Sequence, residues 1–281
     1  MSRLDRLQGK VVVVTGAAGG MGREMAVLAA RHGARVAVSD VAADALAETV
    51  DLVKHAGAEV HSEVVDVADR AAMTAYAAAV AAHFGRVDVV VNNAGVTVTG
   101  DFEDMTYDDF DWILGINLMG VVHGTKEFLP HLIASGEGYL VNISSLFGLI
   151  SVPGQSAYNT TKYAVRGFTE ALREEMLVNR HPVSVTCVHP GGIKTGISRN
   201  GRKNAGLDAS AIDELFDTQL ATMPADKAAR IILEGALRRR PRQLVGLDAH
   251  VLHHFGRLTG ARYQDVVARV TARRMPAKRP S

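Results

Sequence analysis

Short valine-rich runs alternate with longer alanine-rich stretches along most of this chain. The short runs suit buried strands, whereas the longer stretches suit helices. The alternation predicts βαβ units with right-handed crossovers. The predicted fold class is therefore α/β, a doubly wound parallel sheet of about seven strands, apolar on both faces because helices cover both. We expect strands at residues 10–15, 35–40, 59–65, 87–92, 138–144, 183–189 and 243–245, and helices at 20–32, 42–56, 69–84, 106–135 and 158–179.

The chain is predicted to form a single domain with a C-terminal extension. No Pro/Gly/Ser-rich linker interrupts it, so residues 1–246 are interpreted as one domain. Within that domain, residues 195–223 are rich in glycine and polar residues and are expected to form a mobile substrate flap with short helices. Residues 247–281 carry apolar positions at helical spacing and are predicted to be a helical extension with a basic tail.

Composition bears on the compartment. The N-terminus is charged and runs into a strand without a cleavage site, and no run of eighteen apolar residues follows. Neither a signal peptide nor a membrane span is predicted. The single cysteine, Cys187, cannot form an internal disulfide, which fits a reducing compartment. We expect a cytoplasmic protein.

Charge is unevenly distributed. From Arg238 onward, eleven Lys and Arg residues face two acidic residues, although the whole chain has a net charge of only +1. Such asymmetry is compatible with contact to nucleic acid or to an anionic membrane surface. The favoured interpretation is a solvated or subunit-facing helix with a basic end, so neither partner is predicted.

A glycine-rich loop follows the first strand. The sequence TGAAGGMG places Gly16, Gly20 and Gly22 between a strand and a helix. Glycines allow a tight turn and close approach of a pyrophosphate, which the N-terminus of the helix then stabilises. The spacing is G-x-x-x-G-x-G instead of the more common G-x-G-x-x-G. The loop predicts a Rossmann-like dinucleotide site.

Asp40 ends the second strand, eighteen residues after Gly22. An acid there can accept hydrogen bonds from the adenosine ribose and would repel a 2′-phosphate. Neither Ala18 nor Val41 offers a positive charge for that phosphate. NAD is therefore predicted over NADP. The alternative is that Asp40 only caps the following helix.

Tyr158 and Lys162 are one helical turn apart. A phenol has a pKa of ~10, and lowering it towards 7 requires about 4 kcal/mol. An ammonium about 4 Å away supplies a similar energy at an effective dielectric constant of ~20. Lys162 could therefore make Tyr158 a general acid and base, although Y-x-x-x-K alone is a common chance pattern.

The position of this pair is more informative. It lies thirteen residues beyond Ser145, and the chain resembles the short-chain dehydrogenase/reductase family over about residues 8–246. The resemblance rests on five ordered motifs: the TGAAGGMG loop, NNAG at 92–95, Asn117 in GINLMG, YNTTK at 158–162, and the PG motif with its threonine at 190–195.

The resemblance implies roles for the matched residues. Ser145 would polarise the substrate oxygen, Tyr158 would exchange a proton with it, and Lys162 would lower the phenol pKa and hold the nicotinamide ribose. Ser144 adjoins Ser145, but the spacing to the tyrosine favours Ser145. The complete catalytic set would be Asn117, Ser145, Tyr158 and Lys162. The cofactor would contact Gly16, Gly20, Met21, Gly22, Asp40, Asp66, Val67, Asn93, Ala94, Gly95, Tyr158, Lys162, Pro190, Gly191, Ile193 and Thr195.

The expected activity is hydride transfer between NAD(H) and a secondary alcohol or ketone. Candidate pocket walls are mostly apolar, which favours a lipophilic substrate: Val96, Leu146, Phe147, Val152, Gln155 and Gly192. No metal site is predicted, and His123 and His131 are expected at the surface or an interface. The resemblance also implies a homodimer or homotetramer. An NADP-dependent reductase and a non-catalytic dinucleotide-binding regulator remain alternatives.

Overall fold

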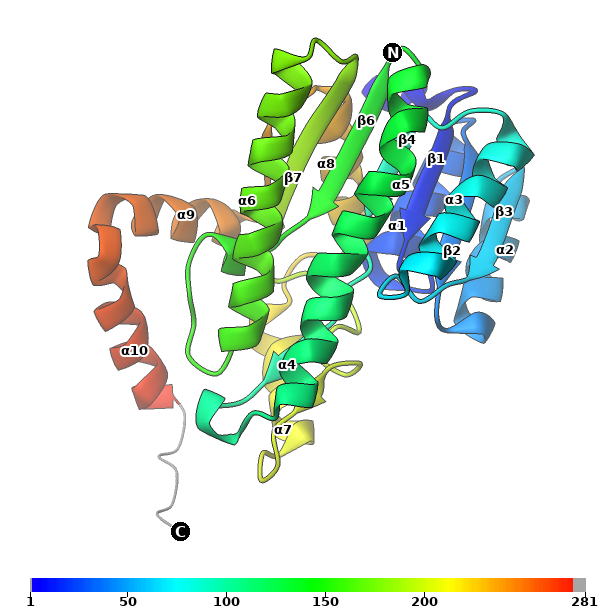
Figure 1. Cartoon of the computed structure of the whole chain (residues 1–281). Helices are drawn as coiled ribbons and strands as arrows, with labels where there is room; N and C mark the ends of the chain where they lie inside the picture. The colour runs from blue at the N-terminus through cyan, green and yellow to red at the C-terminus, as the bar shows by residue number, and fades with distance from the viewer. Residues whose placement is uncertain (1, 275–281) are drawn as a thin grey trace.

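The computed structural model describes residues 2–274, apart from the side chains of Gln219, Arg273 and Arg274. Its centre is a seven-stranded, wholly parallel sheet in the order β3-β2-β1-β4-β6-β7-β9 (Figure 1). The predicted doubly wound α/β fold is confirmed. The strands are β1 (Val11–Thr15), β2 (Arg35–Asp40), β3 (Val60–Val64), β4 (Val89–Asn92), β6 (Gly138–Ile143), β7 (Val183–Pro190) and β9 (Arg242–Val245).

Helices cover both faces of the sheet. Alternate residues of β1 belong to different cores: Val12 and Val14 pack on one side, and Val11 and Val13 on the other. The first face is covered by α1 (Gly20–Arg31), α2 (Ala43–His55) and α8 (Ala225–Leu237), and the second by α3 (Arg70–Phe84), α5 (Gly120–Ala134) and α6 (Ser156–Val178). The edge strand β3 departs from the expected pattern, because its sequence VHSEV leaves Val64 exposed.

The long helical stretch predicted at 106–135 is not one regular helix. It consists of α4 (Tyr107–Leu114), a π-helical segment (Gly115–Met119) and α5. A π segment inserts a residue into the helical repeat and often marks a functional position. Here that segment contains Asn117, which is fully buried.

The predicted flap is folded against the main domain. Its strand β8 (Arg202–Lys203) pairs with β5 (Val98–Thr99), and it continues through α7 (Ala209–Leu215) and a π segment (Phe216–Leu220). Arg202 lies over the Trp112 ring.

The C-terminal extension forms α9 (Leu247–Thr259) and α10 (Tyr263–Arg274), at the side of the molecule that carries α6 (Figure 1). Tyr263 is buried against Leu146 and Ile150. The extension therefore packs on the segment between Ser145 and α6. The last seven residues of the predicted basic tail, 275–281, lie outside the described residues.

Candidate active site

The predicted site residues gather at the carboxyl ends of the parallel strands. Chain connectivity reverses at β1, which pairs with both β2 and β4. Ligands of doubly wound proteins bind at such a switch point. The loops that follow β1, β4, β6 and β7 meet here.

The glycine loop leaves no room for side chains. Gly16 has φ +66°, and a Cβ there would lie 2.6 Å from the Ala94 Cα. A Cβ on Gly22 would overlap the Gly16 carbonyl oxygen. Gly20, with φ +52°, faces Thr195, whose Cγ2 would lie 3.0 Å from an added Cβ. The loops after β1 and β7 therefore meet across a cradle lined by backbone.

Thr15 and Asn93 join the ends of β1 and β4. The Thr15 hydroxyl oxygen accepts the backbone N–H groups of Asn93 (3.0 Å) and Ala94 (3.1 Å). The Asn93 amide donates to the carbonyl oxygens of Thr15 and Gly16, both at 3.0 Å. Asn93 thus shapes the loop through its side chain. Sequence reasoning missed Thr15 because an ordinary strand residue gives no signal.

Asp40 reaches the glycine loop. Its Oδ2 accepts from Ala18 N at 2.9 Å and its Oδ1 from Ala42 N at 3.0 Å. The carboxylate therefore holds the loop as well as the turn before α2. Arg23, which sequence reasoning overlooked, lies nearby, but its guanidinium is bound to Glu48 (2.8 Å) and the Ala18 carbonyl (2.6 Å).

Asp66 and Val67 follow β3. Asp66 Oδ1 accepts from Ala68 N at 2.9 Å, whereas Val67 is buried and its carbonyl oxygen bonds to His123 Nδ1 at 3.0 Å. His123, expected at the surface or an interface, is not a surface residue of the chain, because α5 turns it inward and leaves only 7% exposed.

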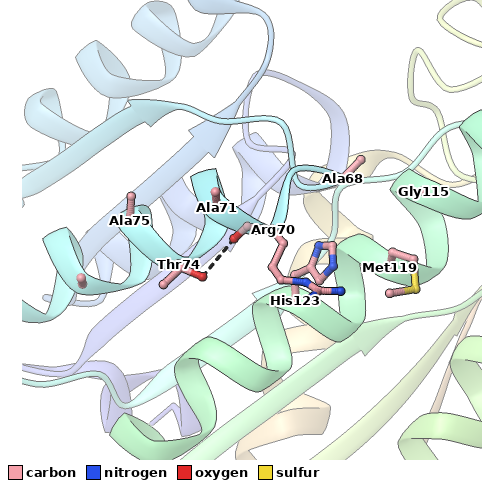
Figure 2. Close-up of a pocket in the computed structure, with 9 residues that line it drawn as sticks. Ala68, Arg70, Ala71, Thr74, Ala75, Gly115, Met119 and His123 are labelled. Carbon is pink, nitrogen blue, oxygen red and sulfur yellow. Dashed lines mark hydrogen bonds between the residues drawn. The ribbon is translucent and has the colours of Figure 1, made fainter.

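A shallow pocket of about 890 Å³ lies beside His123, between α3 and α5 (Figure 2). Met119 and Gly115 border it on one side, and Ala71 and Thr74 on the other. None of the predicted catalytic residues lines this pocket, so it is distinct from the cradle at the strand ends.

Tyr158 and Lys162 lie on one face of α6, with the Lys162 Nζ 5.5 Å from the centre of the Tyr158 ring. The Phe147 ring packs edge-on against Tyr158 at 6.0 Å. Burial raises the pKa of Tyr158 to about 12, against an opposing hydrogen bond from Ser145. The predicted lowering of the phenol pKa is therefore not found in this structure.

Lys162 is itself strongly affected by burial, which lowers the pKa of its amine to about 8. Its side chain is only 3% exposed, and Nζ donates to the Ile143 carbonyl oxygen at 3.1 Å. Gly95 adjoins it: a Cβ there would lie 3.4 Å from Nζ and 3.2 Å from the Asn117 Oδ1. The chain after β4, the π segment and α6 are thus closely packed around the Lys162 amine.

The geometry distinguishes the two adjacent serines. Ser144 Oγ donates to the Lys162 carbonyl oxygen at 2.8 Å, so this hydroxyl holds α6 to β6. Ser145 Oγ accepts from Phe147 N at 3.1 Å, and this hydroxyl acts to lower the pKa of Tyr158. Ser145 is therefore the serine beside the phenol.

Asn117 connects three elements. Its Oδ1 accepts from Val96 N at 2.8 Å, and its Nδ2 donates to Val96 O at 2.9 Å and to Thr161 Oγ1 at 3.2 Å. The π segment is thereby tied to the chain after β4 and to α6. Every polar atom of this side chain has a protein partner.

The loop after β7 is held by the extension. Pro190 ends β7, and the following Gly192 N–H donates to Asp248 Oδ2 at 2.7 Å. A Cβ on Gly191 would overlap that carboxylate. Ile193 forms a bridge to Met223 at the end of the flap. Sequence reasoning counted Asp248 only as one of the acidic residues after Arg238 and did not predict this contact.

His189 is a further residue that sequence reasoning missed. It is fully buried in β7, and its Nδ1–H donates to the Ser145 carbonyl oxygen at 2.8 Å. Burial lowers the pKa of His189 to about 4, so the ring is neutral at physiological pH. Its Nε2 has no hydrogen-bond partner among residues 2–274.

The proposed pocket walls are only partly adjacent to Tyr158. Phe147 packs against it, but Leu146 is buried with Tyr263 of the extension. Gln155 accepts from Thr97 Oγ1 at 3.1 Å and donates to Thr99 Oγ1 at 2.9 Å, so it supports β5.

Among residues 2–274, no group of three or more His, Cys, Asp or Glu side chains could hold a metal ion. None of the helices formed by residues 2–274 is long and apolar enough to span a membrane.

Comparisons with known proteins agree with this architecture. The model of the short chain dehydrogenase family matches residues 10–206. SadH of Mycobacterium tuberculosis, named as an oxidoreductase, is 50% identical over 97% of this chain and 99% of its own length. A short chain dehydrogenase/reductase of Burkholderia phymatum in complex with NAD superposes with a TM-score of 0.82, at 30% identity and full coverage of both chains. A short chain dehydrogenase of Mycobacterium paratuberculosis bound to NAD gives 0.75 at 28% identity, covering 85% of this chain and 97% of its own.

Proposed function

The chain belongs to the short-chain dehydrogenase family, and we propose that it transfers a hydride between NAD(H) and a lipophilic secondary alcohol or ketone. The observation that carries this proposal is the burial of Ser145, Tyr158 and Lys162 together at the switch point of the sheet. A non-catalytic dinucleotide-binding regulator would not require these three buried side chains for proton transfer.

The backbone cradle supports a dinucleotide cofactor. Side chains are excluded from Gly16 and Gly22, so a pyrophosphate can approach the loop and the N-terminus of α1. Asp40 uses one lone pair on each oxygen for the backbone and can accept ribose hydroxyls with the others. Because the nearby Arg23 is already paired with Glu48, a 2′-phosphate would meet a net negative surface, which favours NAD over NADP. Both solved relatives above contain NAD.

A bound nicotinamide supplies the hydride donor or acceptor, and the protein manages the proton. With a pKa of about 12, the Tyr158 phenol is protonated at neutral pH and can donate to a carbonyl oxygen that is being reduced. The resulting phenolate would be stabilised by the Lys162 cation, which remains mostly protonated at pH 7 because its pKa is about 8. Ser145 would donate a hydrogen bond to the same substrate oxygen.

Asn117 has a supporting role in this proposal. Its amide bonds keep the π segment, the chain after β4 and α6 in fixed register. A π segment within a helix is frequently found at a functional site, and we propose that this one holds a water of the proton relay. Asp66, Val67, Met21, Pro190, Ile193 and Thr195 are proposed to complete the cofactor contacts, at the adenine and nicotinamide ends.

The lipophilic substrate class rests on the surroundings of Tyr158. The cluster around the phenol includes Val96, Phe147 and Ile197. Aromatic and aliphatic walls contribute binding energy through apolar contact and leave an ionic substrate unpaired. We also propose a cytoplasmic homo-oligomer whose basic C-terminus contacts neither nucleic acid nor membrane.

Cofactor titration is the first test. Purified protein is titrated with NADH and, separately, with NADPH, and nicotinamide fluorescence is recorded. We expect NADH to bind more tightly, and Asp40→Ala to reduce that preference. Tighter NADPH binding would refute the cofactor assignment, and no binding of either would refute the enzyme proposal.

Turnover is then measured with a panel of lipophilic alcohols and NAD⁺. Tyr158→Phe is expected to lower kcat at least about 100-fold without changing the Kd for NADH, because only the proton-exchanging group is removed. Tyr107→Phe is the matched control, since Tyr107 is 88% exposed. Equal turnover by Tyr158→Phe and the wild type would contradict the assigned role.

A further inference from the structure

The extension closes a second, cationic pocket that takes no part in the proposed reaction. It has a volume of about 390 Å³ and lies between α6, the start of β9 and α9. Its lining residues are Leu149, Arg166, Arg242, His253, Gly256 and Arg257. Three of these six residues are arginines, each with a guanidinium group.

One face of α9 forms a wall of this pocket. His253, Gly256 and Arg257 are spaced three and four residues apart and therefore share that face. Glycine at 256 permits close packing, because a Cβ there would lie 3.0 Å from Ile150 Cγ2. His253 is 8% exposed, and its ring centre lies 5.2 Å from that of His254.

The opposite wall carries two arginines that share one carboxylate. Glu170 Oε1 accepts from Arg166 Nε at 3.1 Å and also from Arg242 Nη2. Burial acts to raise the pKa of Glu170, but hydrogen bonds from Arg242 and Arg166 outweigh it and lower the pKa below the usual value, so the carboxylate is charged.

The positive charge of the pocket is not fully compensated. Arg257 forms no ion pair with any carboxylate in the described part of the chain, so three guanidinium groups face one carboxylate. Burial lowers the pKa of His253, and the neighbouring charges of Arg242 and Arg257 lower it further. Cations gathered without enough carboxylates favour the binding of an anion.

We propose that this pocket binds a small oxyanion, the phosphate or carboxylate group of a low-molecular-weight ligand. Arg242 and Arg257 would be its main donors, since a guanidinium offers two parallel N–H groups to two oxygens of such a group. The volume exceeds that of phosphate alone, which favours a phosphorylated or carboxylated small molecule. The same chemistry can also come from a carboxylate of a second copy of this chain.

Isothermal titration calorimetry of the full chain with inorganic phosphate tests the proposal, with glycerol 3-phosphate and succinate as further probes. We expect one phosphate per chain. Arg257→Gln should weaken its binding at least tenfold, because one of the charged donors is lost. The variant should fold normally because Arg257 is exposed, and circular dichroism checks this. The matched control is Arg262→Gln, an exposed arginine of the same extension outside the pocket, and it should bind as the wild type does.

The difference between these two variants separates this pocket from the dinucleotide cradle, which both leave intact. Equal phosphate affinity in Arg257→Gln and the wild type would refute the proposal, as would the absence of binding at about 20 mM phosphate. The titration is repeated at several protein concentrations alongside sedimentation velocity. If phosphate bound only to dissociated monomers, the pocket would belong to a contact between subunits. That result would refute the proposal that it binds a free ligand.

Discussion

Replacing His189 with asparagine tests whether the buried imidazole makes stability depend on pH. The pKa of His189 is about 4 in the folded protein, against ~6.5 for an exposed histidine. Between these values the folded protein binds fewer protons than the unfolded chain, so the free energy of unfolding falls as the pH decreases. The full shift corresponds to about 3 kcal/mol, and the part between pH 7.5 and pH 5 to about 2 kcal/mol.

Asparagine can retain an N–H donor for the Ser145 carbonyl oxygen but does not titrate. Urea unfolding of the wild type and His189→Asn is measured at pH 7.5 and pH 5. We expect the pH-dependent loss of stability to be smaller by about 2 kcal/mol in the variant. Other titrating groups are present in both proteins. Subtracting the pH-dependent loss of stability in the variant from that in the wild type therefore removes their contribution. The same loss in both proteins would refute the interpretation that a neutral, desolvated His189 supports Ser145.

Three further changes test the site and its support. Tyr263→Phe removes the hydroxyl that accepts the Ser151 N–H (2.9 Å), which should lower the free energy of unfolding in urea by about 1–2 kcal/mol. The variant should also have a higher KM and an unchanged affinity for NADH, and unchanged stability would contradict this. Gly22→Ala should abolish the NADH fluorescence signal, because its Cβ overlaps backbone, whereas Gly19→Ala, with no atom within 4 Å of the new Cβ, should keep it. Asp88→Asn should cost about 1.5–3 kcal/mol in urea unfolding, because Arg86 loses the charged acceptor of its hydrogen bonds; a loss below about 0.5 kcal/mol would count against this ion pair.

The sequence predicted those features that depend on local pattern. Strand ends agree to within one or two residues, because turns and glycines mark them, and the parallel pairing of the strands follows from the alternation of helices and strands. The split of the helix predicted at 106–135 was not foreseen. It depends on contacts of Asn117 with Val96 and Thr161, which are distant in the sequence.

The pKa of Tyr158 could not be predicted for a similar reason. The sequence argument weighed the attraction between a phenolate and Lys162 but could not include the desolvation of either group. In the structure both side chains are buried, and desolvation favours the neutral form of each. The spacing of two residues on a helix determines their contact, whereas the polarity around them depends on every element that packs there.

The extension shows how such long-range packing shapes the candidate site. Asp248, in its first turn, holds the Gly192 N–H in the loop after β7, and Tyr263 holds the Ser151 N–H in the segment between Ser145 and α6. The two bonds hold the loop after β7 and the segment that follows Ser145. Because a lost hydrogen bond leaves a partly buried N–H unpaired, both segments are more stable with the extension than without it. We therefore infer that residues 247–274 are a structural part of the site, even though none of the family motifs lies within them.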